Sequence, residues 1–254
     1  MNDVSKIRLS NNASDEFSKK IVLKINGDIY NDSFDLEVVI EAEALLNIVL
    51  YDFISEKNLE GLSVEVLIDD SCFFNGLILR ANLSHNLKDK RMVANLKCKQ
   101  EFSSLEVIKK SKILNKGTIL SDVIPSNLTK DIVLTDDLIL LEHDTLGKLN
   151  TLKEELNLPY FSIAKDKVNF VDFSAKKNKV KNIIKAIVNK TVDNFEHLQI
   201  ITEFNDGVSV GDVIVYDDNL YAIETVVYSW NHNQGLLQEI HAINNDLHKA
   251  RYLR

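Results

Sequence analysis

Alternating apolar and polar positions predict β-strands along most of this chain, and two stretches follow the same plan. Each stretch has a first strand with a glycine, a polar turn with an Asp-Asp pair, and a second strand that continues into a hairpin. In one stretch the first strand is 61–68, the turn is 69–71 and the second strand is 72–79, and the stretch ends at 100. In the other stretch the first strand is 208–216, the turn is 217–219 and the second strand is 220–227, and the stretch ends at 243. Two such units in one chain favour a ring or a tube over an enzyme.

More strands are predicted before the first unit. Residues 21–25 read as a strand, and Asn26-Gly27 is a typical hairpin signal, so 28–30 should begin the return. Another strand is expected at 34–40 after a polar turn.

The run 44–54 is apolar on every side, and periodicity alone fits either a buried helix or a strand. We favour a strand, because Ile48, Val49 and Tyr51 suit a pleated surface and the flanking segments are strands.

Between the two units, the pattern changes to short helices. Residues 103–108 should begin a helical or irregular link, and 117–124 a capped helical turn that stops at Pro125. The best helix follows an N-cap at Asp144-Thr145. Its apolar stripe is Leu146, Leu149, Leu152 and Leu156, with Lys148, Lys153, Glu154 and Glu155 expected mainly on the other face.

After this helix, a strand hairpin is expected from 160–164 and 168–173. The lysine-rich run 176–190 has no interleaved aromatic residues, so a solvated linker or helix face is favoured over a nucleic-acid patch. Residues 198–204 should open the second unit.

The predicted fold class is mainly β with a small α+β insert. The expected domains are a flexible N-terminal arm at 1–19, a first β domain at 20–104, an α+β insert at 105–193, a second β domain at 194–246 and a C-terminal tail at 247–254.

Composition is that of an ordinary globular protein, with 254 residues, 45% hydrophobic and 27% charged. The net charge of -8 argues against a nucleic-acid groove, because duplex binding relies on Lys and Arg neutralising phosphates. The N-terminus lacks an apolar signal region and no run has the length of a membrane span. We therefore expect a soluble protein made in the cytoplasm.

The residue types that carry chemistry are scattered. Cys72 and Cys98 have no metal spacing and are expected as small buried thiols. No GxSxG, P-loop or GxGxxG motif occurs. The histidines, without an HExxH or HxH pair, are His85, His143, His197, His232, His241 and His248.

Paired carboxylates and clustered aromatic residues each allow two interpretations. The pairs Asp69-Asp70, Asp136-Asp137 and Asp217-Asp218 could suggest acid and base catalysis, but two of them occupy predicted hairpin turns, which Asp favours. A sugar-binding surface could use Tyr216, Tyr221, Tyr228 and Trp230. Packing is favoured, because Tyr221 and Trp230 lie nine positions apart and would face opposite sides of a continuous strand. The sequence thus assigns no catalytic residue, no cofactor and no metal ligand.

The order of these elements resembles the baseplate hub proteins of bacteriophage tails, of the T4 and Mu types. The segments that carry the resemblance are 61–78, 117–124, 145–173, Val210-Gly211-Asp212-Val213 and 221–230. It extends over most of 20–245. The chain departs from the pattern where Leu62, and not aspartate, follows the glycine of the first unit.

The resemblance implies two tail-tube-like β-barrels per chain and a homotrimer whose six barrels form a pseudo-hexameric ring. Such a hub joins the sixfold tail tube protein to the threefold central spike protein, contacts other baseplate proteins and lets DNA or cargo pass. A negatively charged channel would suit this, because it repels phosphates. The implied location is the virion tail of a phage or a related contractile injection machine.

Two other functions stay open. A binding module, such as a hexameric distal-tail or adhesion-type protein, would organise receptor-binding partners. A cell-wall hydrolase is the third possibility, and it would need an essential carboxylate.

Overall fold

This computed structural model describes the chain except for residues 1–18, 42, 52–57, 87–90, 102–104, 127–131, 157, 159–160, 165–166, 171–176, 179, 181, 191–195, 206, 232 and 245–254. Nearly all of the predicted N-terminal arm and the whole predicted tail at 247–254 lie outside the described residues. None of the helices in the described part is long and apolar enough to cross a membrane.

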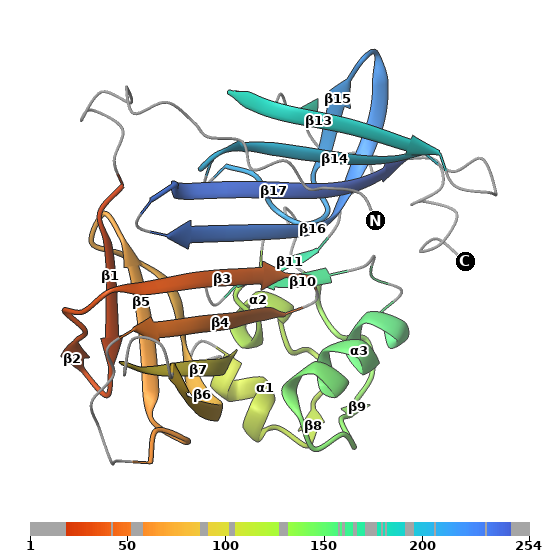
Figure 1. The fold of residues 1–254 in the computed structure, drawn as a ribbon. Helices are drawn as coiled ribbons and strands as arrows, with labels where there is room; N and C mark the ends of the chain where they lie inside the picture. The colour runs from red at the N-terminus through yellow and green to blue at the C-terminus, as the bar shows by residue number, and fades with distance from the viewer. Residues whose placement is uncertain are drawn as a thin grey trace.

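One curled sheet of 13 strands dominates the molecule (Figure 1). Its main path runs β13-β14-β17-β16-β3-β4-β7-β6-β5-β1-β2, and β15 attaches to β16 and β12. In chain order the strands are β1 Ile21–Ile25, β2 Asp28–Ile29, β3 Phe34–Ile40, β4 Ala44–Tyr51, β5 Ser63–Ile68, β6 Ser71–Asn86, β7 Arg91–Gln100, β12 Lys177–Asn178, β13 Ile183–Lys190, β14 Glu196–Glu203, β15 Val213–Tyr216, β16 Asn219–Asn231 and β17 Gly235–Asn244. The predicted class, mainly β, is confirmed, and the apolar run after position 43 is the strand β4.

The two repeated stretches have the same strand order. In the first unit the order is β3-β4-β7-β6-β5-β1, and in the second it is β13-β14-β17-β16-β15-β12. The last pairing differs, because β1 joins β5 antiparallel whereas β12 joins β15 parallel. The duplication seen in the sequence is therefore a duplication of sheet topology.

Backbone hydrogen bonds around one glycine repeat in both units. Gly61 N–H donates to the Ile78 carbonyl at 2.8 Å, and Gly211 N–H donates to the Ile223 carbonyl at 2.8 Å. Both glycines have a positive φ, of 84° and 91°, a conformation that suits residues without a Cβ. Leu62, which departs from the Gly-Asp pattern, accepts through its carbonyl from Ile78 N–H, just as Asp212 accepts from Ile223 N–H. The backbone makes these bonds, so the side chain can change.

The Asp69-Asp70 and Asp217-Asp218 pairs form the predicted tight turns. The φ values are 48° and 63° at Asp69 and Asp70, and 48° and 60° at Asp217 and Asp218. Positive φ at both central residues is the requirement of a type I′ hairpin turn, which aspartate tolerates better than most residues. Asp69 also accepts from the backbone N–H of Lys20 at 3.0 Å and pairs with the Lys19 ammonium.

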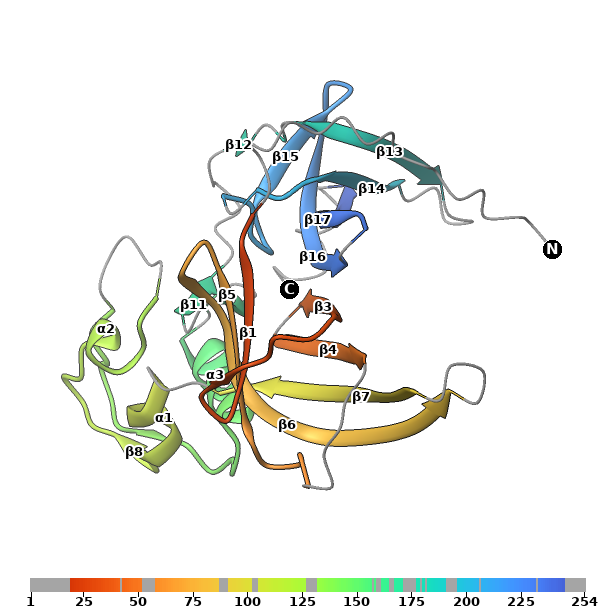
Figure 2. The ribbon, with the colours of Figure 1, turned by 60° about the vertical axis from the view of Figure 1, so that its left-hand side comes forward.

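A single apolar core runs through both units. Its fully buried members come from first-unit strands, such as Leu46 and Ile48 of β4, and from second-unit strands, such as Ile200 of β14 and Ile240 of β17. The two units therefore share one hydrophobic interior, and Figure 2 shows β16 of the second unit beside β3 of the first.

The α+β segment between the units has a separate core, which is centred on Ile108, Leu149 and Leu152. Its elements are α1 Glu106–Lys110, β8 Ile113–Leu114, α2 Leu120–Val123, β9 Leu138–Ile139, α3 Thr145–Glu155, β10 Phe161–Ala164 and β11 Lys167–Phe170. As predicted, Asp144 caps α3, since its Oδ1 accepts from Gly147 N–H at 2.6 Å. The helical turn predicted within 117–124 is present as α2, but it has no side-chain cap, so the predicted capping was wrong. The division of the chain into domains stays a prediction.

Three further sequence predictions were wrong. Residues 183–190 form a strand, β13, which pairs with β14, so this part of the lysine-rich run is neither a linker nor a helix face. Lys148 is buried rather than solvated, because its ammonium group bonds to main-chain carbonyls of α1. Cys72 is exposed next to the Asp-Asp turn, whereas Cys98 is buried as expected.

Candidate functional site

The feature that joins the two units is the edge of β16. Its first part pairs with β15, from Asn219 to Ala222, and its later part pairs antiparallel with β3 of the first unit. The register at this junction runs from Val226 opposite Ile40 to Trp230 opposite Leu36. Backbone pairing thus carries the sheet from one unit into the other without a break.

Aromatic side chains pack on the inner side of this junction. The Trp230 ring lies 4.6 Å from Phe34 of β3, and the Tyr228 ring meets Phe73 of β6 edge-on at 4.9 Å. Phe204, just after β14, contacts the rings of Phe73 and Tyr228 at 6.0 and 5.6 Å. These contacts join four different strand regions, and such pairs add to the stability that burial alone provides.

The Tyr228 hydroxyl connects the junction to the turn of the second unit that runs from Val208 to Gly211. It donates to the Val208 carbonyl at 3.4 Å and accepts from Gln238 Nε2 at 3.1 Å. Gln238 is fully buried, and its Oε1 accepts from Asn205 N–H at 3.2 Å. Buried polar groups are thereby satisfied, which fixes the position of the turn relative to β16.

The aromatic cluster noted in the sequence is mainly part of the core. Tyr221 and Tyr228 are buried, which confirms packing for these two residues, and Trp230 packs against the same core. The prediction that Tyr221 and Trp230 face opposite sides was wrong, because a bulge at Glu224 shifts the alternation by one residue. The Tyr221 hydroxyl donates to Glu196 Oε2 at 3.0 Å. The pKa of Tyr221 is raised to about 12, chiefly by burial and in addition by this hydrogen bond.

Two long strands of the main sheet have an edge that is unpaired within the described part of the chain. Beyond Ile78 the strand β6 pairs with β7 on one side only, and β13 pairs only with β14. The strand path begins at β13 and ends at β2, and β6 lies on the opposite side of the molecule from β13 (Figure 2). Exposed apolar residues occur on both strands, namely Leu79 and Leu83 on β6 and Ile183, Ile184 and Val188 on β13. Open edges with apolar side chains favour pairing with another strand.

Sequence reasoning missed these edges. In β13 the alternation of apolar positions is obscured by lysines, and the sequence therefore favours a solvated linker or a helix face for this segment. The signal was present in the run Ile183-Ile184-Lys185-Ala186-Ile187-Val188, which is rich in β-branched residues.

The remaining candidate residues do not come together. Asp137 accepts from Lys116 N–H at 2.7 Å in the insert, far in sequence from both Asp-Asp turns. His241 pairs with Glu239 at 2.8 Å on β17. His232 and His248 lie outside the described residues. Among the residues that the structure describes, no three His, Cys, Asp or Glu side chains form a group that could hold a metal.

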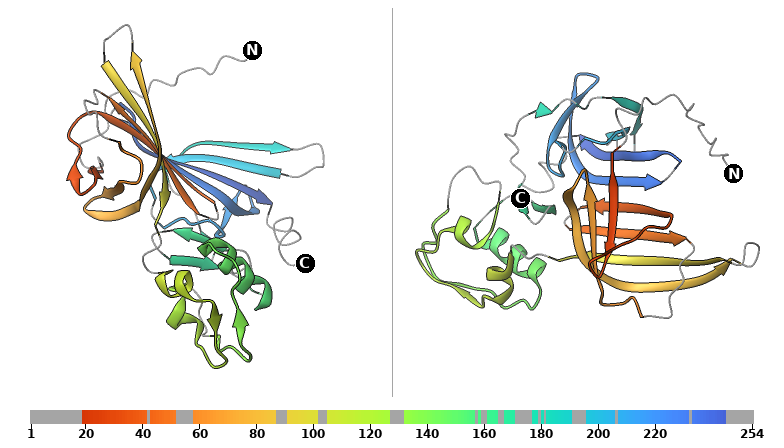
Figure 3. Two further views of the ribbon diagram at one scale, coloured as in Figure 1. Left: turned by 90° about the horizontal axis from the view of Figure 1, so that it is seen from below. Right: turned by 90° about the vertical axis from the view of Figure 1, so that its left-hand side faces the viewer.

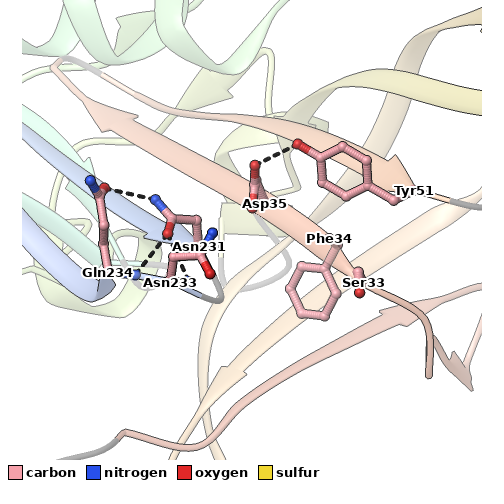
Figure 4. Close-up of a pocket in the computed structure, with 7 residues that line it drawn as sticks. All are labelled: Ser33, Phe34, Asp35, Tyr51, Asn231, Asn233 and Gln234. Atoms are coloured by element: carbon pink, nitrogen blue, oxygen red, sulfur yellow. Dashed lines mark hydrogen bonds between the residues drawn. The ribbon is translucent and has the colours of Figure 1, made fainter. Parts of the chain in front are cut away.

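A shallow pocket lies where the tip of the β16–β17 hairpin meets β3 and β4 (Figure 4). Tyr51 donates to Asp35 Oδ2 at 2.7 Å, and this bond raises the pKa of Tyr51. Asn231 Oδ1 accepts from the backbone N–H of Gln234 at 2.8 Å. The lining residues are Ser33, Phe34, Asp35, Tyr51, Asn231, Asn233 and Gln234. Several of these polar groups bond to one another, so their role is to hold the hairpin tip and the strand ends in place.

Comparisons with known proteins identify the fold of this chain. No family model and no curated protein matches the sequence. Among solved structures, a tail protein from Neisseria meningitidis aligns with a TM-score of 0.65 and 11% identity, over 90% of this chain and 97% of that one. The chain has the fold of bacteriophage tail proteins.

Two further structures agree with this fold. A 43 kDa tail protein of prophage MuSo2 from Shewanella oneidensis aligns with a TM-score of 0.67 and 11% identity, over 91% of this chain and 98% of that one. An Escherichia coli component of the type VI secretion system, described as similar to T4 tail proteins, aligns with a TM-score of 0.57 and 11% identity, over 87% of this chain and 76% of that one. The predicted resemblance to tail proteins is thus confirmed at the level of fold.

Proposed function

We propose that this protein is a structural tail component that assembles as a trimeric baseplate hub. Each chain would contribute two tail-tube-like barrels, one per repeated unit, so three chains would present six similar units in a ring. Such a ring matches a sixfold tail tube protein on one side and a threefold central spike protein on the other. The observation that supports this most is the repeat of one strand order within a single continuous sheet.

Internal duplication is what a symmetry adaptor needs. Two similar but not identical units per chain give pseudo-sixfold positions with true threefold symmetry. The net charge of -8 suits a channel through which DNA passes without binding. The proposed role is structural, in the tail of a phage or of a related contractile injection machine, beside other baseplate proteins.

Mass measurement of the purified protein by light scattering tests this proposal. A trimer of three times the 28.9 kDa chain mass is expected. A hexamer would favour the distal-tail or adhesion-type alternative, and a chain that stays monomeric up to high concentration would contradict the hub. Negative-stain images of the trimer should show a ring with six similar lobes.

A further inference from the structure

We propose that copies of this chain join by antiparallel pairing of the open half of β6, residues 81–85, with β13 of the next copy. This contact would reproduce between chains the β16–β3 junction that exists within each chain. The inference deepens the proposed hub function and rests on it for the identity of the partner, a second copy of this chain.

The two open edges correspond to the two strands of the internal junction. In the shared strand order, β6 of the first unit occupies the place of β16, and β13 occupies the place of β3. Within the chain, β16 of the second unit pairs with β3 of the first. The equivalent pair, β6 with β13, has no intrachain counterpart in the described sheet. The internal junction is therefore a template for the missing one.

The bulges in β6 and β16 fix the equivalence of individual residues on this side. Leu79 is the extra residue of β6, between Ile78 opposite Cys98 and Arg80 opposite Lys97. Glu224 is the extra residue of β16, between Ile223 opposite Ala242 and Thr225 opposite His241. Residues 81–85 therefore correspond to 226–230. The glycine hydrogen bonds to Ile78 and Ile223 give the same equivalence.

The partner strands align through their neighbours β4 and β14. Cys98 of β7 lies opposite Leu46, and its equivalent Ala242 of β17 lies opposite Leu198. Leu46 pairs with Val38 of β3, and Leu198 pairs with Val188 of β13. Val188 is thus the equivalent of Val38.

These equivalences predict the register between copies. Tyr228 pairs with Val38 at the internal junction, so Leu83 of one copy should pair with Val188 of the next. The other expected pairs are Ala81 with Lys190, Asn82 with Asn189, Ser84 with Ile187 and His85 with Ala186.

Burial supports this register. Tyr228 and Val38, which meet at the internal junction, are only 4% and 1% exposed. Leu83 and Val188, which would meet between copies, are 51% and 41% exposed, although both are large apolar residues in strands. Ala81 and Ala186 already pack against the core and lie on the same face as this pair. Pairing would therefore cover two exposed apolar side chains with each other and continue the core across the contact.

The backbone of β6 is also oriented for pairing. Ala81 N–H donates to Glu60 Oε1 at 3.2 Å, which places this donor away from β7. Because the directions of N–H groups alternate along a strand, the N–H of Leu83 points to the same open side. The edge therefore offers the Leu83 N–H to an incoming strand, and the Ala81 N–H could join it if the Glu60 side chain moves away.

The proposed contact is head-to-tail, because it joins two different edges. Head-to-tail contacts generate either closed rings or open filaments. In Figure 3 the β6–β7 hairpin and the β13–β14 hairpin project from different sides of the molecule. Three chains would alternate three internal junctions with three junctions between copies, and closure would leave neither edge open.

Disulfide trapping tests this pairing directly. We would place L83C and V188C in one chain on a Cys72→Ser background, leaving the buried Cys98 in place. Mild oxidation should give covalent trimers on non-reducing gels, because residues directly opposite in antiparallel strands are within reach of a disulfide. A matched control, L83C with I187C, shifts the pair by one residue to the opposite face and should cross-link at least tenfold more slowly. A positive control, S229C with E37C, uses the internal junction and should form a disulfide within one chain.

Charge exchange provides a second test. Leu83→Lys should weaken the trimer at least tenfold without changing the melting temperature of the isolated chain, because the side chain is exposed there. Adding Val188→Glu should restore assembly, since the two opposite charges would face each other across the strands.

The outcomes separate the two proposals. Trimers that fail to cross-link through L83C and V188C, while S229C and E37C oxidise, would overturn the pairing and leave the hub function standing. Cross-linked assemblies of another size would support the pairing and contradict the trimeric hub. A chain that stays monomeric would contradict both.

Discussion

In the insert, the Lys148 ammonium group donates to the carbonyl oxygen of Ser111 at 2.7 Å. It also bonds to the carbonyls of Lys109 at 2.8 Å and Ile108 at 3.2 Å. These carbonyls lie at the end of α1, where the helix has no further N–H groups to satisfy them. A lysine from α3 thus acts as the C-terminal cap of α1, at a site that is only 4% exposed.

Replacing this lysine should destabilise the insert. Lys148→Met keeps the apolar stem but leaves three carbonyls without their charged donor, so we expect a loss of about 3 kcal/mol in the free energy of unfolding. Chemical denaturation monitored by circular dichroism measures it. Lys153→Met, on the same helix, should cost less than about 0.5 kcal/mol. Equal losses in the two variants would contradict the capping role.

Gly76 is required by the close approach of β6 to β7. A Cβ at this position would overlap the carbonyl oxygen of Lys99 and the ring of Phe74. Neither backbone nor packed ring can move freely, so Gly76→Ala should cost about 3 kcal/mol in unfolding free energy. Gly207→Ala is the control, because its Cβ would meet only the Asn205 side chain at 3.3 Å. A thermal melt that ranks the two variants equally would refute this account.

The buried phenol of Tyr221 should make stability depend on alkaline pH. Its pKa is raised to about 12 in the fold, whereas an unfolded tyrosine ionises near about 10. The folded state favours the neutral phenol, so this contribution is complete below about pH 10 and is lost as the pH rises toward 12. Unfolding free energies measured between pH 8 and 11.5 should fall less steeply for Tyr221→Phe than for the natural protein. Parallel curves would show that Tyr221 does not contribute.

The two cysteines should differ sharply in reactivity. Burial raises the pKa of Cys98 to about 12, so its reactive thiolate is scarce at neutral pH, whereas Cys72 is exposed. A thiol reagent such as Ellman's should titrate one thiol in the folded chain at pH 8 and two after denaturation. Cys72→Ser should remove the fast thiol, and rapid reaction of this variant would contradict the burial of Cys98.

Local signals in the sequence were sufficient for the hairpins. Asn26-Gly27, Asp69-Asp70 and Asp217-Asp218 all adopt positive φ in tight turns, and the flanking strands then pair in a register set by the turn. The N-cap of α3 was equally readable, because Asp144 acts on a backbone group only three residues away.

Contacts between distant segments were not readable in the same way. Nothing near Trp230 in the chain indicates that its ring will pack against Phe34, because the β16–β3 pairing is set by the whole sheet. The bulge at Glu224 leaves no composition signature, and it reversed the expected side of Trp230. Lys148 was placed on the solvent side because its acceptors lie almost forty residues earlier.

The internal β16–β3 junction also affects how the proposed ring would form. Since both strands belong to one polypeptide, this contact forms at a fixed effective concentration and needs no encounter between molecules. In a six-unit ring, the formation of only half of the junctions would then depend on protein concentration. The equilibrium concentration of rings would vary with the third power of the concentration of free chains. A ring of six separate subunits would depend on the sixth power of subunit concentration. The ring could therefore form at a much lower protein concentration.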